Sequence, residues 1–235
     1  ISSLKLAEMA GREPLFKMGQ VRWYKKPTAG HVYLCALDPS LGTGGDYAGL
    51  EVIAIPSFEQ VGEWNNNLTP VQAQARILRD ICKYINDECQ RKANSPASIY
   101  YSAENNTLGE AALVSISEIG EENIRGVFLS EPKKMGGGGT RFRKGFNTTN
   151  KSKLAACAKL KSLVETKRMN IASKLLISEL KNFIAAGTGF AAKLGETDDL
   201  VMGTPYAISK FYVVQEGTRP AEGYSPTWLP HLWRV

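Results

Sequence analysis

The apolar and polar positions of this chain predict a group of strands first and alternating strands and helices afterwards. HVYLCALD, at 31–38, is a continuous apolar run that ends on an acid, as a buried central strand does. Two further strand-like runs follow, YAGLEVIAIP at 47–56 and FEQVGEW at 58–64. Their close succession predicts an antiparallel meander.

A long helical pattern begins at Thr69-Pro70, with Thr69 placed as the N-cap and Pro70 at the first helical position. Its apolar face is formed by Val71, Ala75, Ile77, Leu78, Ile81, Cys82, Ile85 and Cys89. Further elements are expected as strands at 97–104, 126–132 and 169–171, helices at 105–120, 150–168 and 173–183, a hairpin at 183–194, and a last helix that starts at the Asp198-Asp199 pair. Alternation of this kind predicts parallel pairing and a three-layer α/β build.

Length and composition predict one sizeable domain. With 235 residues and 43% hydrophobic content, the chain has enough apolar material for a single core. We expect an N-terminal linker or extension at 1–30, the main domain at 31–216, and a Pro- and Trp-containing tail at 217–235 on the surface. No apolar run has the length of a membrane span, and no signal peptide is recognisable. Because the first residue is Ile1, we expect a piece excised from a longer polypeptide.

The cysteines and histidines limit the possible metal chemistry. Four cysteines are scattered without a C-x-x-C pair, which indicates a reducing, intracellular setting. Two histidines are too few to build a zinc site with these cysteines. A bound metal would therefore need oxygen ligands.

The positive charge of the chain is concentrated in one stretch. Residues 133–174 contain twelve basic residues and one acid, a net charge of +11, so with +6 overall the remainder carries −5. A basic part beside an acidic part indicates a polyanion held next to a carboxylate-rich site. Some of these lysines are equally well explained as a solvated helix face.

Three carboxylate positions lie at the end of a predicted strand or at the start of a predicted helix. Asp38 ends one strand, Glu104 ends a second, and Asp198 and Asp199 begin a helix. In an open α/β sheet the chemistry gathers at the carboxyl ends of strands. If the strands 31–38 and 97–103 are adjacent and parallel, Asp38 and Glu104 lie at the same edge of the sheet. The last helix can then place Asp198 and Asp199 opposite them.

Each of these acids also has an ordinary explanation. Asp38 suits a strand-end turn, Glu104 a loop, and Asp198 or Thr197 an N-cap. Taken together they favour a metal site, because crowded carboxylates are costly without a cation. Magnesium and manganese take oxygen ligands. Two such ions about 3.5–4 Å apart can activate a water and stabilise the leaving oxygen in phosphodiester cleavage.

These motifs carry a family resemblance. A strand-ending Asp in a meander, a Glu ending the fourth strand and a late Asp-Asp before a helix resemble the layout of RNase H-like nucleases. More narrowly, ALDPSLGTGGDYAGLEV, SAENNTLGEA, GFNTTNKSKL with LISELKNF, and GETDDLVMG resemble the nuclease domain of the tailed-bacteriophage terminase large subunit, over roughly 32–214. The resemblance implies an RNase H-like α/β fold, with a mixed sheet of five or more strands, an antiparallel meander plus parallel strands, flanked by helices.

The resemblance also implies roles for single residues. Asp38 matches a metal ligand shared by two ions, Glu104 the second catalytic carboxylate, and Asp198 or Asp199 the third, without a choice between them. Asp46, in GGDYAG, matches a supporting acid. The implied cofactors are two Mg²⁺ or Mn²⁺ ions, with a metal-activated water as the nucleophile.

The implied function is a metal-dependent endonuclease that cuts double-stranded DNA when a viral genome is packaged. The family carries its ATPase motor in the same polypeptide, whereas this chain has no G-x-x-x-x-G-K-[ST] motif. The implied partners are that motor, the capsid portal and the small terminase subunit, with no membrane. The implied location is the cytoplasm of an infected bacterium.

The stretch KKMGGGGTRFRKGFNTT, at 133–149, is predicted to be a glycine-rich basic loop that contacts DNA phosphates without distinguishing sequence. A flexible hairpin tip or a long crossover is the alternative. The expected DNA-binding residues are Lys133, Lys134, Arg141, Arg143, Lys144, Lys151 and Lys153.

Two other classes of function stay open. LDPSLGTGGD resembles the D-x-G-T phosphate loop of actin-like and sugar-kinase-like modules, which need two such domains and a second phosphate motif. A catalytically silent DNA-binding module of RNase H-like fold is the second. Other RNase H-like nucleases, resolvases and transposases, remain alternatives within the nuclease class. Metal-dependent cleavage separates a nuclease from the first two, and nucleotide binding identifies the kinase-like module.

Overall fold

A mixed seven-stranded sheet forms the centre of the computed structural model, which describes residues 1–105, 109–134, 140–186, 189–195, 197–198 and 200–204. The strand order is β1-β2-β5-β4-β3-β6-β7. The strands are β1 (Phe16–Met18), β2 (Val21–Trp23), β3 (Val32–Asp38), β4 (Ala48–Ile55), β5 (Glu59–Asn66), β6 (Ser98–Ala103) and β7 (Val127–Phe128). β3, β4 and β5 form the predicted antiparallel meander, and β6 pairs in parallel with both β3 and β7. The predicted α/β fold is confirmed.

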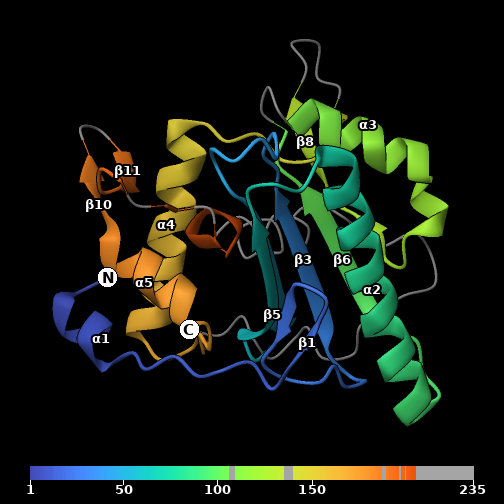
Figure 1. Ribbon diagram of the computed structural model, residues 1–235, viewed down its shortest axis with the longest axis horizontal. Helices are drawn as coiled ribbons and strands as arrows, with labels where there is room; N and C mark the ends of the chain where they lie inside the picture. Colours follow the sequence, from blue (N-terminus) through green and yellow to red (C-terminus); the bar gives the residue numbers. More distant parts are fainter. Residues whose placement is uncertain (106–108, 135–139, 187–188, 196, 199, 205–235) are drawn as a thin grey trace.

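Helices cover both faces of this sheet. They are α1 (Ser3–Glu8), α2 (Val71–Ala93), α3 (Gly109–Ile119), the 3-10 turn η1 (Glu121–Asn123), α4 (Asn150–Glu165) and α5 (Lys174–Asn182), and residues 200–204 are also helical. α2 and α3 lie on one side of the sheet, and α4 and α5 lie on the other (Figure 1). Among the described residues, no helix is both long and apolar enough to cross a membrane.

The central strands separate two apolar cores because both of their faces are covered. On β3, Tyr33, Cys35 and Leu37 pack toward α2 and α3, whereas Val32, Leu34 and Ala36 pack toward α4 and α5. Every residue of β4 is buried. A strand buried on both faces needs a continuous apolar run, which is why its period-two pattern is hidden in the sequence.

The sheet begins earlier in the chain than the sequence indicated. β1 and β2 come from residues expected to form a linker, and β2 pairs with β5 at Arg22↔Glu63 and Trp23↔Gly62. The burial of Trp23 gives this segment its anchor in the α2 core. The division of the chain at residue 30 stays a prediction, but the sheet extends across it. The tail predicted at 217–235 lies outside the described residues.

The start of α2 differs from the prediction. Pro70 is the N-cap, no side chain caps the helix, and Val71 is its first residue. Thr69 instead donates its hydroxyl to Asn66 Oδ1 at 2.9 Å. Thr69 as N-cap was therefore wrong by one position, because the Pro70 ring occupies the place where a cap side chain would bond to the first amides.

The stretch predicted as a basic loop contains a β-hairpin. β8 (Ser130–Lys134) pairs with β9 (Thr140–Lys144) in antiparallel register, and the four glycines at 136–139 lie outside the described residues. The alternation of Arg141, Phe142 and Arg143 is the period-two signal of a strand. The hairpin alternative is thus correct for the parts of this stretch that belong to β8 and β9.

Of two smaller predicted elements, the strand at 169–171 is absent and the hairpin at 183–194 is present. Residues 169–171 form no strand, and Asn170 makes only an isolated bridge to Glu59. The expected hairpin at 183–194 is present as β10 (Phe183–Ala186) and β11 (Gly189–Ala192).

Candidate active site

Asp38 is the last residue of β3, and Glu104 directly follows the adjacent parallel strand β6. β3 and β6 pair in parallel up to Leu37↔Ala103. The amide of Glu104 donates to the carbonyl of Leu37 at 2.9 Å, so the ladder extends to the two acids. The predicted adjacency and direction of these strands are confirmed, and both acids lie at the same edge of the sheet.

Both acids face the layer of α4 and α5. Leu37 and Ala103, one residue before each acid, pack in the core beneath α2 and α3. Because successive side chains of a strand point to opposite faces, Asp38 and Glu104 point to the other face. Asp38 is half-buried, and Glu104 is only 6% exposed.

Glu104 is held by the segment between β9 and α4. Its strand continues into a bridge with Phe146, whose amide donates to the carbonyl of Ala103 at 3.1 Å. The hydroxyl of Thr148 donates to Glu104 Oε1. Gly145 permits this approach, because it has a φ of +73° and a Cβ there would lie 2.5 Å from the carbonyl oxygen of Ala103.

The loop after Asp38 is fixed against the start of α2. Gln74, which is fully buried, donates from Nε2 to the carbonyls of Ser40 at 2.8 Å and Thr69 at 2.7 Å. Gly42 lies so close to Thr69 that a Cβ would be 2.1 Å from its carbonyl oxygen. These contacts restrain the backbone that leaves Asp38.

Asp198 lies at the start of the helical segment at 200–204, the last that the structure describes, as predicted. Its carbonyl accepts from the amide of Met202 at 2.7 Å, which marks the first helical turn. The amides of Leu200 and Val201 donate to Glu179 Oε2, each at 3.0 Å. For these two amides the capping carboxylate is therefore Glu179 of α5, and neither Thr197 nor Asp198 fills that role.

The carboxylate of Asp198 pairs with a lysine of α4. Lys153 Nζ lies 3.5 Å from Asp198 Oδ2 and 5.6 Å from the centroid of the Phe183 ring. Phe146, Ala156 and Met202 form a small apolar cluster with Phe183 packed against it. This cluster joins the Glu104 segment, α4 and the last helix, so packing holds all three beside one another.

The sequence also predicted Asp46 and Asp199 as site residues. Asp46 is exposed in the loop before β4, and Asp199 lies outside the described residues. Within the ranges that the structure describes, no three Asp, Glu, His or Cys side chains are grouped closely enough to hold a metal ion. The roles assigned to Asp38, Asp46, Glu104, Asp198 and Asp199 stay predictions.

The predicted DNA-binding residues come from the β8–β9 hairpin and α4. Lys133 and Arg141 are register partners across the hairpin. Lys144 pairs with Glu121, and both side chains are partly exposed. Lys151 is exposed in the first turn of α4, whereas Lys153 turns toward Asp198.

The sequence interpretation missed residues that hold the acids in place. Thr148, Gln74 and Glu179 each form hydrogen bonds that fix an acid or the backbone beside it. For Glu179 a signal exists, because it lies three residues after Leu176 and one before Leu180, on the buried side of an amphipathic helix. A carboxylate in such a position needs polar partners.

A buried polar network lies between the sheet and the layer of α4 and α5. Gln60 Nε2 donates to Glu51 Oε2 at 2.9 Å and to Glu63 Oε2 at 3.2 Å. Glu63 Oε1 accepts from Arg22 Nε and from the Tyr24 hydroxyl, each at 2.7 Å. Burial first, and then the neighbouring Glu63, raises the pKa of Glu51 well above its ordinary value. Glu51 is thus favoured in its protonated form.

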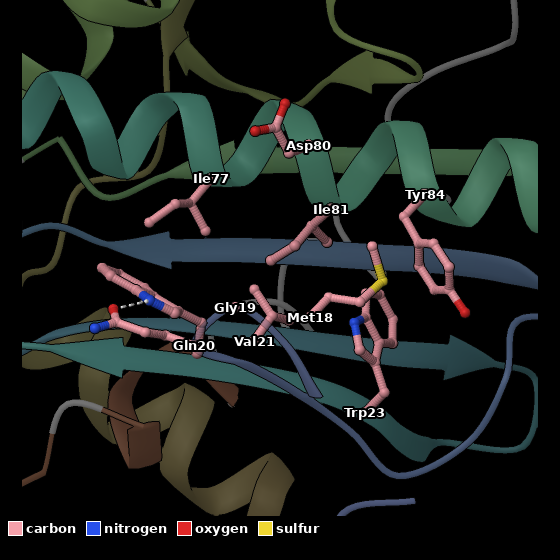
Figure 2. Close-up of a pocket in the computed structure, with 10 residues that line it drawn as sticks. Met18, Gly19, Gln20, Val21, Trp23, Ile77, Asp80, Ile81 and Tyr84 are labelled. Atoms are coloured by element: carbon pink, nitrogen blue, oxygen red, sulfur yellow. Dashed lines mark hydrogen bonds between the residues drawn. The ribbon is translucent and has the colours of Figure 1, made fainter. Parts of the chain in front are cut away.

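An apolar groove lies on the opposite side of the sheet. It has a volume of about 380 Å³ and is lined by Met18, Gly19, Gln20, Val21, Trp23, Trp64, Ile77, Asp80, Ile81 and Tyr84. Figure 2 shows the α2 side chains above and those of β1 and β2 below, with Asp80 pointing away from the apolar groups. The lining residues belong to the α2 side of the sheet, so the groove is separate from the acidic edge.

Comparison with solved structures identifies the fold. The large terminase nuclease of thermophilic phage G20c superposes with a TM-score of 0.62 at 16% identity, over 88% of this chain and 96% of that one. This is the fold of a terminase nuclease domain. The Thermus phage P74-26 large terminase nuclease domain has a TM-score of 0.59 at 17% identity, over 94% and 97% of the two chains. The human cytomegalovirus terminase nuclease domain has 0.56 at 12%, over 89% and 94%.

These structural similarities confirm the resemblance that the sequence motifs indicated, at the level of the fold. Structures of the G20c nuclease with bound magnesium, cobalt or zinc are also similar to this chain. No protein-family model matches the sequence. The identities are low, so the chemistry of this chain has to be argued from its own residues.

Proposed function

We propose that this chain is the nuclease domain of a terminase large subunit, a divalent-metal-dependent endonuclease that cleaves double-stranded DNA during viral genome packaging. One observation carries the proposal. Asp38 and Glu104 lie at the ends of adjacent parallel strands at one edge of a terminase-nuclease fold, and Asp198 begins the helix packed on the same face. These acids thus come from three separate elements that border the same face of the sheet, and we propose that their carboxylates share one metal site.

The donor set of this region suits magnesium or manganese. Asp38, Glu104 and the 198–199 pair offer only oxygen ligands, which hard divalent cations prefer. The ammonium of Lys153 lies against Asp198, as expected where negative charge accumulates and a cation is favoured. Two bound ions would supply activation of a water and stabilisation of the leaving oxygen. Asp46 is proposed to support the site from the adjoining loop.

The residues around the acids have separate tasks in this proposal. Thr148 keeps Glu104 Oε1 oriented by donating a hydrogen bond to it. Lys153, whose ammonium lies beside Asp198, is placed to contact a DNA phosphate near the scissile bond. Further phosphate contacts come from the hairpin and α4, through Lys133, Lys134, Arg141, Arg143, Lys144 and Lys151.

The proposed partners follow from the terminase resemblance. They are an ATPase motor in the same polypeptide, the capsid portal and the small terminase subunit, in the cytoplasm of an infected bacterium. These partners would restrain cleavage to the start and end of packaging.

Cleavage of supercoiled plasmid in Mg²⁺, Mn²⁺ or EDTA tests the proposed function. We expect nicking and linearisation that require metal and fall at least about 100-fold in Asp38→Asn and in Glu104→Gln, because loss of a residue that only supports a metal ligand already costs about 10–100-fold. Asp198→Asn and Asp199→Asn, tested separately, determine which acid of the pair is essential.

Asp80→Asn is the matched control, because Asp80 is an acid that lines the groove on the other side of the sheet. It should cleave like the wild type. DNA binding without cleavage in either metal would favour a silent DNA-binding module, and ATP binding without DNA binding would favour a kinase-like module. Retained cleavage in both Asp38→Asn and Glu104→Gln would show that these acids are not the metal ligands.

A further inference from the structure

Glu179 is a buried acid that the proposed reaction does not itself use. It belongs to α5 and is 8% exposed, within the layer that covers the acidic edge of the sheet. Its neighbours Leu176, Ile177 and Leu180 pack in the α4 and α5 core. A carboxylate among apolar side chains is stable only where polar groups satisfy it.

Three hydrogen bonds join Glu179 to the beginning of the helical segment at 200–204. Glu179 Oε2 accepts from the amides of Leu200 and Val201, each at 3.0 Å. Glu179 Oε1 accepts from the hydroxyl of Thr197 at 3.2 Å. One side chain from a different helix thus binds residues on both sides of the Asp198-Asp199 pair.

This arrangement replaces the cap that the sequence predicted. The first amides of a helix lack backbone acceptors, and an Asp or Thr at the N-cap ordinarily accepts from them. Here Glu179 accepts from two of them, so Asp198 is not needed for this purpose. The carboxylate of Asp198 is directed to Lys153 instead, at 3.5 Å.

We propose that Glu179 is a positioning residue for the third carboxylate of the metal site. By binding Thr197, Leu200 and Val201, it fixes the backbone on either side of Asp198, so that the Asp198 carboxylate is not needed as a cap and is available to a divalent cation. This inference rests on the proposed function, because it concerns the same site. Because Glu179 of α5 accepts from the amides of Leu200 and Val201, Asp198 can begin this apolar helix without capping those amides.

Binding of Mn²⁺ to the DNA-free protein, measured by calorimetry, tests this role without any cleavage. Glu179→Ala removes both acceptor oxygens, and we expect the Kd for Mn²⁺ to rise about tenfold, equivalent to about 1.4 kcal/mol. Glu179→Gln keeps an oxygen for the two amides and should stay within about twofold of the wild type. Plasmid cleavage should show the same change as a higher Mn²⁺ requirement, with little change in the rate at saturating metal.

Ser173→Ala is the matched control for simple loss of a helix cap. The Ser173 hydroxyl accepts from the amide of Leu176 at 3.0 Å, at the start of the helix that carries Glu179. Its removal should lower the urea midpoint of unfolding about as much as Glu179→Ala does and leave the Kd for Mn²⁺ within about twofold. If it weakened Mn²⁺ binding as much as Glu179→Ala, the effect would be general loosening, and the positioning role would be overturned.

A second variant covers the case in which Glu179→Ala does not fold. Thr197→Val removes one of the three hydrogen bonds, and we expect it to raise the Kd for Mn²⁺ about threefold. An unchanged Kd in the folded variants, with the wild type binding Mn²⁺, would overturn this inference alone. Absence of Mn²⁺ binding by the wild type would overturn the proposed metal site and this inference with it.

Discussion

Carboxylates of the same type serve quite different purposes in this protein, according to what surrounds each of them. Glu104 accepts from Thr148 at the edge of the sheet, and Glu179 caps a helix from a neighbouring one. Glu51 lies fully buried in the middle of β4, where its Oε1 has no hydrogen-bond partner among the described residues. Burial of a carboxylate without a cation favours its protonated form.

The raised pKa of Glu51 makes the stability of the fold depend on pH. The native state keeps this proton above pH 4.5, the ordinary value, whereas the unfolded chain loses it there. Between that value and the raised native pKa, the native state binds more protons, so the free energy of unfolding falls as the pH rises. Glu51→Gln removes this loss and should raise stability at pH 8 by on the order of 1 kcal/mol, as urea unfolding from pH 5 to pH 9 can measure.

Glu118→Gln is the control for this measurement, since Glu118 is an exposed acid of α3. It should leave the pH dependence of unfolding unchanged. If the wild type and Glu51→Gln lost stability equally with rising pH, Glu51 would not hold the proton.

At the scale of single helices, the two long ones begin in different ways. α4 starts with a capping box, in which Thr149 Oγ1 accepts from the amide of Ser152 at 3.1 Å and Ser152 Oγ accepts from the amide of Thr149 at 2.8 Å. α2 starts at Val71 without a side-chain cap. The stability of α4 therefore depends on its N-cap residue more than that of α2 does.

Two threonine variants measure this difference. Thr149→Ala should lower the free energy of unfolding by about 1 kcal/mol, the usual loss for an N-cap. Thr69→Ala, which loses one hydrogen bond to Asn66 near the surface, should cost only about half as much. Urea unfolding at neutral pH provides both values, and an equal loss in the two variants would contradict the assignment of the caps.

For the molecule as a whole, the basic hairpin of the proposed DNA surface adjoins the acidic edge, because the segment that follows β9 bridges to Glu104 at Phe146. The hairpin brings Lys133 and Arg141 into register, and they belong to the stretch at 133–174, which has a net charge of +11. Binding that neutralises phosphates releases counterions, so its strength falls with salt in proportion to the number of contacts.

Loss of hairpin charges should therefore weaken the salt dependence of DNA binding. For Lys133→Ala with Arg141→Ala, the slope of log Kd against log salt should fall by about two, roughly one per phosphate contact. Fluorescence anisotropy with a labelled duplex in EDTA measures it. Lys144→Ala is the comparison, and because Lys144 already pairs with Glu121 it should change the slope by less. An unchanged slope in the double variant would place the DNA elsewhere.

Much of the architecture was predictable because it follows from local pattern. The buried run that ends on Asp38, the meander after it and the strand that ends before Glu104 all appear where the sequence predicts them. β3 is buried on both faces and therefore needs a continuous apolar run, which is visible without any tertiary information, whereas β4 and β5 also bury the acids Glu51 and Glu63. The strands β1 and β2, at one end of the sheet, were missed because each has only three residues.

The sequence by itself determined which acids stand at strand ends and helix starts, since those positions depend on neighbouring residues. The tertiary structure alone decided how each acid is held. Glu104 meets Thr148, Asp198 meets Lys153, and the last helix is capped from α5. These contacts join residues far apart in the chain, and hydrogen bonds and ion pairs of that kind form only after packing has placed the elements side by side.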